Sequence, residues 1–443
     1  MKKRHLTPAR QIALGFLIVI VLGAALLMLP IASKGESAGV VDALFTSTSA
    51  TCVTGLIVRD TFTGWTTFGQ VVILCLIQLG GLGFMTVLTL LSFAIGKRLG
   101  LYDRKVLMQS AGNLSLSGIG ALLRRIIPMS FVFELLGAGL LAIRLVPEFG
   151  WGRGAYFSVF HSVSAFCNAG FDLMGVRAPY SSLTAYAADP LVTLTIAALI
   201  ILGGLGFFVW RDIARCGFHV SKYQLHTKLV LTTTLVLLLG GWLAFFFLEG
   251  NASMAGMPAG QRVLASFFQS VTPRTAGFNT VDQTRLSESG SLLTSIFMLI
   301  GGSPGSTAGG VKTTTIAVLF LSAIVSARGR TRVNAFRYSI DRDTLRQASS
   351  IVFIYLAMAV AAILAVCALD PLSLKQALFE ANSAIGTVGL SLGVTPTLSE
   401  PSLLILALLM YAGRIGGMTF VLLFSERRNE PPRDRPSGKL LLG

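Results

Sequence analysis

The sequence predicts an all-α polytopic membrane protein, a bundle of eight transmembrane helices that holds four re-entrant loops. Three observations predict it: 53% of the 443 residues are hydrophobic, only 13% are charged, and the mean hydropathy is +0.73. A water-soluble chain of this size carries about a quarter charged residues. Five cysteines, none in CxxC spacing, exclude a disulfide scaffold. The composition also excludes an ordinary soluble enzyme and a disordered chain.

Eight apolar stretches are long enough to cross a bilayer, which takes about 20 residues of helix. The first is too long for a signal peptide, so we expect it to remain as a helix. The stretches lie near residues 12–30, 66–96, 121–147, 189–215, 227–248, 290–327, 347–369 and 401–425. Most lysines and arginines fall on the side that holds both termini, which predicts that both are cytoplasmic. The net charge of +16 is then mainly a topology signal and not a nucleic-acid patch.

The loops between paired stretches repeat one another. Four segments align without gaps, and each has a phenylalanine ten residues before a glycine that is followed by Leu or Phe. They are FTSTSATCVTGL (45–56), FHSVSAFCNAGF (160–171), FFQSVTPRTAGF (267–278) and FEANSAIGTVGL (379–390). Chance does not place four such coincidences in one chain, so the chain is predicted to be a fourfold repeat of helix–loop–helix units.

The repeated loops are too short and too polar to cross a membrane, and each is expected to form a short helix followed by a glycine-containing strand. Non-helical backbone at membrane depth needs shielding by protein or water, which four loops around one axis can give each other. Because glycine lacks a Cβ, carbonyl oxygens can turn toward that axis and replace the hydration shell of a monovalent cation. The negative C-terminal ends of the short helices would also point at the ion. The pattern therefore favours a cation pore over simple tight turns.

With these motifs the chain resembles the KtrB/TrkH/HKT superfamily of potassium transporters over almost its whole length. The strongest matches are TSATCVTGL (48–56), SAFCNAGFD (164–172), TPRTAGFNT (272–280) and SAIGTVGLSLG (383–393). TrkH-type members usually carry an additional N-terminal hairpin of spans, which this sequence does not show, so its size and span number are similar to KtrB-type membrane subunits.

The resemblance implies four M1–P–M2 units (membrane helix, pore loop, membrane helix) in a pseudo-fourfold arrangement around one pore. The expected units are 1–100, 101–220, 221–335 with a broken M2 helix, and 336–443 with a basic cytoplasmic tail. It also implies uptake of potassium across a bacterial plasma membrane, with sodium as an activating ion. The implied partners are a second copy of the chain, membrane lipids, and a cytosolic KtrA-type RCK ring, octameric in the family, through which ATP or ADP acts. No cofactor is expected on this chain.

Carrying the family's filter over position by position assigns the potassium-coordinating carbonyls to each repeat glycine and the two residues before it. The last residue of each three-residue segment is glycine in all four repeats, whereas the two residues before it differ from repeat to repeat. This is expected where backbone oxygens bind the ion. Only the fourth segment reads TVG as potassium channels do, which indicates a ring less discriminating than a strict channel filter. The filter is predicted to comprise Val53, Thr54, Gly55, Asn168, Ala169, Gly170, Thr275, Ala276, Gly277, Thr387, Val388 and Gly389.

The second span of the third unit is interrupted by GGSPGSTAGGVKTTT (301–315). Glycine and proline break helices, so we expect two half-helices joined by a mobile loop below the filter, which in the family is the gating loop. Arg414 lies inside the last span, where a charge is functional by default. We expect Arg414 to bind loop carbonyls and oppose cation passage, with helix packing as the alternative. Lys312 could act in the same way, with snorkelling toward the cytoplasm as the alternative. The predicted gate comprises Gly301, Gly302, Ser303, Pro304, Gly305, Ser306, Thr307, Ala308, Gly309, Gly310, Lys312 and Arg414.

Other residues are given structural interpretations. The glycine clusters at 80–83 and 203–206 are expected to allow close helix packing. Arg274 is expected to brace the third loop by hydrogen bonds, with an outer-face charge as the alternative. Cys167 stands where many relatives have Asn, which leaves open a change in hydrogen bonding behind the filter. His161, on the second short helix, is expected to be a structural hydrogen-bond donor.

Two other function classes compete with a potassium-translocating subunit. An intramembrane transferase needs convergent acid–base or metal-binding residues, and a proton-coupled symporter needs intramembrane carboxylates. The spans hold only Glu134, Lys312 and Arg414 well inside them, and Glu134 is interpreted as a buried hydrogen-bonding group or a dimer contact. No metal-site spacing or P-loop occurs. The chain is therefore not expected to be an enzyme, and a proton- or sodium-coupled cation symporter remains the alternative.

The basic loops are a candidate docking surface for the cytosolic ring. They lie at 97–125, 211–228 and 328–346, and Arg427 and Arg428 of the tail are expected to assist them. Topology and contact with anionic lipid are the alternative explanation.

Overall fold

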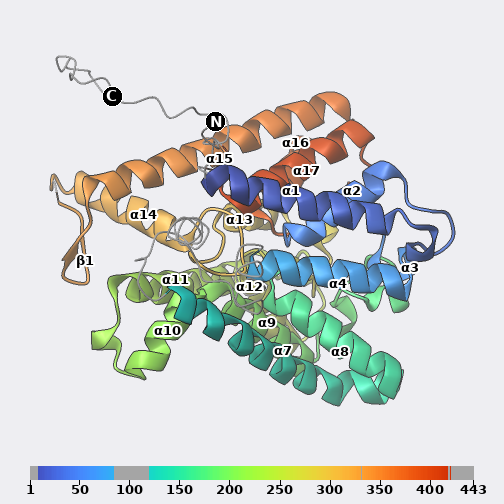
Figure 1. Cartoon of the computed structure of the whole chain (residues 1–443). Helices are drawn as coiled ribbons and strands as arrows, with labels where there is room; N and C mark the ends of the chain where they lie inside the picture. Colours follow the sequence, from blue (N-terminus) through green and yellow to red (C-terminus); the bar gives the residue numbers. More distant parts are fainter. Residues whose placement is uncertain (1–7, 84–118, 331, 418–419, 421–443) are drawn as a thin grey trace, which may run out of the picture.

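The computed structural model describes residues 8–83, 119–330, 332–417 and 420, and these are almost entirely helical (Figure 1). The all-α class is therefore confirmed. The α-helices are α1 (Pro8–Leu27), α2 (Val40–Thr51), α3 (Thr61–Gly64), α4 (Thr67–Leu82), α7 (Ile119–Phe149), α8 (Trp151–Phe166), α9 (Pro190–Leu205), α10 (Phe207–Cys216), α11 (Leu225–Leu248), α12 (Ala259–Val271), α13 (Glu288–Leu299), α14 (Thr313–Ala327), α15 (Arg342–Leu369), α16 (Leu374–Gly386) and α17 (Glu400–Ile415). Short 3-10 turns are η1 (Pro30–Ala32), η2 (Met174–Val176), η3 (Thr184–Tyr186), η4 (Val220–Lys222), η5 (Gln283–Arg285) and η6 (Thr395–Thr397).

A small antiparallel hairpin joins α14 to α15. Its strands are β1 (Asn334–Ala335) and β2 (Tyr338–Ser339), and Asn334 pairs with Ser339. Figure 1 shows it projecting at one end of the bundle, away from the helices.

Four described helices are long and apolar enough to cross a membrane by themselves: 9–27 of α1, 126–149 of α7, α11 and α15. Helices α4 and α14 are shorter apolar helices. The predicted spans 66–96 and 401–425 continue into 84–118 and past residue 420, outside the described residues. The predicted span 189–215 is apolar enough to cross a membrane but is not straight, because α9 and α10 are bent by 91° at their junction.

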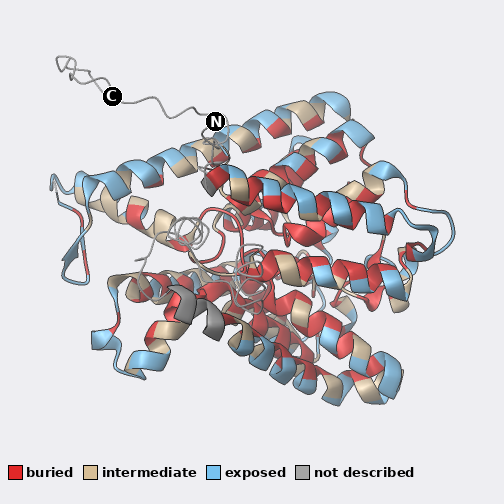
Figure 2. Cartoon of the chain, in the orientation of Figure 1, coloured by how far each residue is buried: buried red, intermediate tan, exposed pale blue. Residues whose placement is uncertain are grey.

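The long helices expose one face and bury the other (Figure 2), and large hydrophobic side chains lie on their exposed faces. Leu135 of α7, Phe247 of α11 and Leu364 of α15 are each about two thirds exposed or more, at 67%, 74% and 67%. Inside, Ser47 and Ser383 are fully buried. Large apolar side chains exposed in this number along the long helices fit a lipid-facing surface.

The helices pack as four triplets that close into a ring. In each, a long helix contacts a shorter helix and a following apolar helix: α1 contacts α2 and α4; α7 contacts α8 and α9; α11 contacts α12 and α13; α15 contacts α16 and α17. The shorter helix also packs against the last helix of a neighbouring triplet: α8 on α4, α12 on α9, α16 on α13, and α2 on α17. The last pair joins the two ends of the chain, so the sequence of contacts has no open end.

Two carboxylates, one buried and one partly buried, hold the first and last helices of their triplets together. Glu249, at the end of α11, accepts hydrogen bonds from the Ser287 N–H at 3.1 Å and the Ser287 hydroxyl at 2.6 Å. Asp370, at the end of α15, accepts the same pair from Ser399 at 3.2 and 3.0 Å. Ser287 and Ser399 are the N-cap residues of α13 and α17, where a negative charge also complements the helix dipole. Glu249 and Asp370 thus stabilise the N-terminal ends of α13 and α17.

Candidate functional site

The four repeated loops share one unusual backbone conformation. The residue two positions before each repeat glycine is left-handed, with φ of 56° at Val53, 59° at Asn168, 65° at Thr275 and 53° at Thr387. The conformation suits asparagine but strains the β-branched valine and threonines. Such strain persists only where the surroundings impose it. All four residues are buried to 1% exposure or less, so the bundle fixes this shape.

The four glycines touch one another's loops in a closed ring. A Cβ added to Gly55 would lie 2.4 Å from the Ala169 carbonyl oxygen, and one on Gly170 would lie 2.7 Å from that of Ala276. A Cβ on Gly277 would lie 2.5 Å from the Val388 oxygen, and one on Gly389 would lie 2.2 Å from the Thr54 oxygen. Their φ values of 94°, 71°, 81° and 92° also favour glycine. Each loop therefore places a backbone carbonyl against the next one, and only glycine permits this approach.

Hydroxyl residues in the last turn of each short helix hold these loops, and the sequence analysis did not identify them. Ser49 and Ser383 accept hydrogen bonds through Oγ from Gly55 N and Gly389 N, both at 3.0 Å. Ser164 donates to the Phe171 carbonyl at 2.7 Å, and Thr272 donates to that of Phe278 at 2.6 Å. Serine recurs at this place in three of the aligned segments, and the third has Thr272 one position later, which was the signal that could have found them.

The third loop is shorter by one residue than the gap-free alignment implies. The N–H of the residue before the glycine bonds five residues back in three loops, as from Thr54 to Ser49 at 2.8 Å, but Ala276 bonds only four back, to Thr272 at 3.0 Å. Correspondingly, Phe268 is fully buried in place of the aligned Phe267, which is partly exposed and packs on the Trp242 ring. The glycine and its two predecessors keep their register.

The predicted interruption between α13 and α14 is present. Ile300 and Val311 form a parallel bridge that brings the loop ends together, and the loop binds the bend between α9 and α10. Ser303 N donates to the Gly204 oxygen at 2.9 Å, and Phe207 N donates to the Gly305 oxygen at 2.8 Å.

The two shorter glycine clusters do more than allow helix packing. Close packing is observed, since a Cβ on Gly80 or Gly203 would lie 2.0 Å from a carbonyl oxygen of the nearest pore loop. In addition, Gly83 and Gly206 have φ of 84° and 91° and end their helices. The bend at Gly206 makes room for the interrupting loop.

Arg414 and Lys312 both bind the interrupting loop. The Arg414 guanidinium donates to the carbonyl oxygens of Thr307 and Gly80, and to that of Gly81 at 3.3 Å. Lys312 Nζ donates back to the Ala308 oxygen at 2.7 Å, so its ammonium points toward the loop. Neither cation forms an ion pair with a carboxylate of the described residues. Two positive charges therefore lie at the loop, satisfied by backbone oxygens.

Arg274 braces the third loop by a hydrogen bond, as expected. It is only 7% exposed, which contradicts an outer-face charge, and its Nη2 donates to the Thr234 hydroxyl of α11 at 3.4 Å. It thus ties the third loop to the first helix of its triplet.

Cys167, Gln78 and Glu134 form a hydrogen-bonded chain behind the second loop. The Cys167 thiol donates to Gln78 Oε1 at 3.4 Å, and Gln78 Nε2 donates to Glu134 Oε1 at 3.0 Å. Glu134 is 4% exposed, so it is a buried hydrogen-bonding group at the end of this series of hydrogen bonds. His161, as expected, is structural: Leu173 N donates to its Nε2 at 3.2 Å, and its Nδ1 lies 2.6 Å from the Phe157 oxygen.

One acidic side chain follows the second loop directly. Asp172 is two residues after Gly170 and accepts a hydrogen bond from Met174 N at 2.9 Å. Burial, together with the nearby charge of Asp60, raises the pKa of Asp172 to about 7. Its charge therefore changes near neutral pH, on the side of the ring where the loops leave it.

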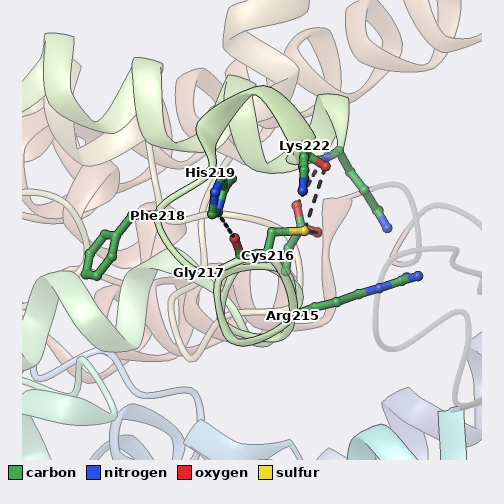
Figure 3. Close-up of a pocket in the computed structure, with 8 residues that line it drawn as sticks. Arg215, Cys216, Gly217, Phe218, His219 and Lys222 are labelled. Carbon is green, nitrogen blue, oxygen red and sulfur yellow. Dashed lines mark hydrogen bonds between the residues drawn. The ribbon is translucent and has the colours of Figure 1, made fainter.

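A surface pocket of about 870 Å³ lies at the turn between α10 and α11, and none of its lining residues belongs to the ring or the interrupting loop. Arg215 and Lys222 extend to one side of it, while Phe218, 99% exposed, points to the other (Figure 3). The pocket coincides with the predicted basic loop 211–228. Most of loop 97–125, and both Arg427 and Arg428, lie outside the described residues.

Apolar helices long enough to cross a membrane, with four loops closed into a ring between them, are typical of a membrane transport protein. The family described as "Cation transport protein" (TrkH) matches residues 6–431, so the chain belongs to the TrkH family and is a transporter, not an enzyme. It is 41% identical to the potassium/sodium uptake protein NtpJ of Enterococcus hirae, over 100% of this chain and 99% of that protein. It is 40% identical to the Ktr system potassium uptake protein B of Bacillus subtilis, over 99% and 97%.

The fold is also that of a solved relative. The crystal structure of the potassium transporter TrkH from Vibrio parahaemolyticus matches 96% of this chain and 86% of that chain, with a TM-score of 0.75 at 18% identity. The resemblance to the superfamily is therefore confirmed.

Proposed function

We propose that this chain takes up potassium across a bacterial plasma membrane through a filter of backbone carbonyls. The closed ring of glycine–carbonyl contacts carries the proposal, since in it each repeat glycine meets a backbone oxygen of the next loop. Carbonyl rings of this kind replace the hydration shell of potassium. The filter comprises Val53–Gly55, Asn168–Gly170, Thr275–Gly277 and Thr387–Gly389. The ring of triplets supports four M1–P–M2 units, with boundaries at 1–100, 101–220, 221–335 and 336–443.

The gate of this pore is the loop 301–310 with Lys312 and Arg414. The loop lies against the filter, because a Cβ on Gly309 would be 2.1 Å from Thr387 Oγ1. Arg414 joins this loop to α4 on one side, and the bend at α9 and α10 holds it on the other. Positive charge at this place repels a cation in a low-dielectric setting.

Sodium acts as an activating ion in this proposal, and the names of the relatives support a role for both cations. The Enterococcus protein is named for potassium and sodium, and the Bacillus protein for potassium. Both termini are placed in the cytoplasm by the positive-inside rule. Two copies form a dimer, and a KtrA-type ring passes the signal of ATP or ADP to the gate.

Potassium-dependent growth tests the function directly. Expression of the chain together with a cognate ring subunit should restore growth of a potassium-uptake-deficient bacterium at low potassium. Absence of rescue, with and without the ring subunit and despite membrane expression, contradicts potassium uptake.

The basic cytoplasmic segments are proposed to dock the ring. The β1–β2 hairpin within 328–346 displays Phe336 and Arg337 at its tip, both left-handed, and Phe336 is 46% exposed. Replacing the arginines of 328–346, Arg427 and Arg428 by glutamine should weaken co-purification of the ring, because their charge attracts an acidic face. Arg59→Gln, on the side opposite the termini, is the control and should leave co-purification intact. Unchanged co-purification in the cytoplasmic variant removes this proposal.

A further inference from the structure

Three polar atoms from different elements meet below the second filter segment. The Thr307 hydroxyl of the gate loop donates toward the Phe166 carbonyl at 3.0 Å and the Asn168 side-chain oxygen at 3.2 Å. Asn168 Nδ2 in turn lies 3.4 Å from the Thr275 hydroxyl of the third filter segment. Thr307, Asn168 and Thr275 are all buried to 1% exposure or less. A hydrogen-bonded path therefore runs from the gate loop into two neighbouring filter segments.

The meeting point depends on a missing side chain. A Cβ on Gly203 would lie 2.0 Å from the Phe166 oxygen, 2.8 Å from Asn168 Oδ1 and 2.9 Å from Thr307 Oγ1. Glycine at this position in α9 thus leaves the space in which the three atoms converge. The close approach is built into the helix packing.

Thr307 is also the residue at which the gate loop is most firmly held. Its carbonyl oxygen accepts from Arg414, and its N–H donates to the Gly203 oxygen at 3.3 Å. Movement of the loop away from this place would break the contacts of the Thr307 hydroxyl along with the others. Asn168 would then lose one of its two side-chain contacts.

We propose that Thr307 is a positioning residue for the filter: its hydroxyl fixes the Asn168 side chain and the Phe166 carbonyl, so the gate loop sets ion preference as well as flux. Asn168 supplies a filter carbonyl and is left-handed at φ 59°, so release of its side chain changes the geometry of that carbonyl. This inference rests on the proposed filter and gate. It adds that the two are coupled through one hydroxyl.

Thr307→Val removes the hydroxyl and keeps the side-chain shape. In liposomes it should lower the preference for potassium over sodium by about fivefold, or ~1 kcal/mol. Thr307→Ser restores a hydroxyl and should keep the wild-type preference. Thr46→Val is the matched control, because the Thr46 hydroxyl is buried without a hydrogen-bond partner in the described residues. It should also keep the wild-type preference.

A double-mutant cycle approaches the same contact from the filter. The single variant Asn168→Ala should lower the preference for potassium over sodium. Adding Thr307→Val to it should change that preference little further, since the shared contact is already lost. Additive effects, or a wild-type preference in folded Thr307→Val, overturn the coupling. If the gate itself is misassigned, Arg414→Ala fails to raise flux; if only the coupling is wrong, Arg414→Ala raises flux while Thr307→Val keeps its preference.

Discussion

Gly389→Ser should lower the apparent affinity for potassium at least tenfold, or ~1.4 kcal/mol, and reduce the preference for potassium over sodium. The new Cβ would lie 2.2 Å from the Thr54 carbonyl oxygen, at a φ of 92° that side chains rarely adopt. Either the carbonyl or the glycine backbone must move, and both belong to the proposed filter. Serine at Gly55, Gly277 and Gly170 should act in the same direction, with Gly170 least affected because its clearance is 2.7 Å.

Potassium uptake kinetics at several sodium concentrations measure this effect. Gly139→Ser is the control, because Gly139 lies on the outside of α7 with no atom within 4 Å of an added Cβ. It should retain the wild-type affinity. Wild-type affinity in all four filter variants would falsify the filter assignment.

Removal of the gate should raise potassium flux. Deleting part of 303–309 shortens the loop between its two ends, Ile300 and Val311, which lie side by side in a parallel bridge. Arg414→Ala should act similarly by removing charge. At an effective dielectric constant of about 20, unit charges about 8 Å apart repel by about 2 kcal/mol, which corresponds to a rise in flux on the order of tenfold or more.

A set of substitutions separates charge from packing at Arg414. Arg414→Gln should raise flux as alanine does, whereas Arg414→Lys should keep it low, since lysine retains the charge. Lys375→Gln removes a surface charge and should leave flux unchanged. Liposome flux at matched protein content, with and without the ring subunit, reads the result. Reduced flux from well-folded Arg414→Ala and loop-deleted protein would place the barrier elsewhere.

The helical class and the ring glycines were predictable because the length of an apolar stretch and the repetition of a short segment can both be read from neighbouring residues. The four glycines recur at one position in aligned segments, each followed by Leu or Phe, and all four lie in the ring. The shortened third loop was not predictable in this way. Phe267 and Phe268 are adjacent and identical, so the alignment could not tell which one is buried.

The contacts that hold the site were less predictable, because they join residues far apart in the chain. Arg414 meets Gly80 across 333 intervening residues, and nothing local in either segment indicates it. The bend at Gly206 was also missed, because GGLG at 203–206 reads equally well as a packing motif. The backbone conformation of Gly206 depends on the gate loop that fills the bend.

Assembly of all four filter segments from one chain removes the constraint that identical subunits impose. A homotetrameric ring would carry four loops and four arginines beneath its centre, because symmetry repeats every feature. Here one loop contacts the second segment through Asn168 and the fourth through Thr387, and one arginine holds it. A substitution in this protein alters only one of the four segments around the pathway. In a homotetramer the same substitution alters all four segments at once, so mutation can change this protein in smaller steps.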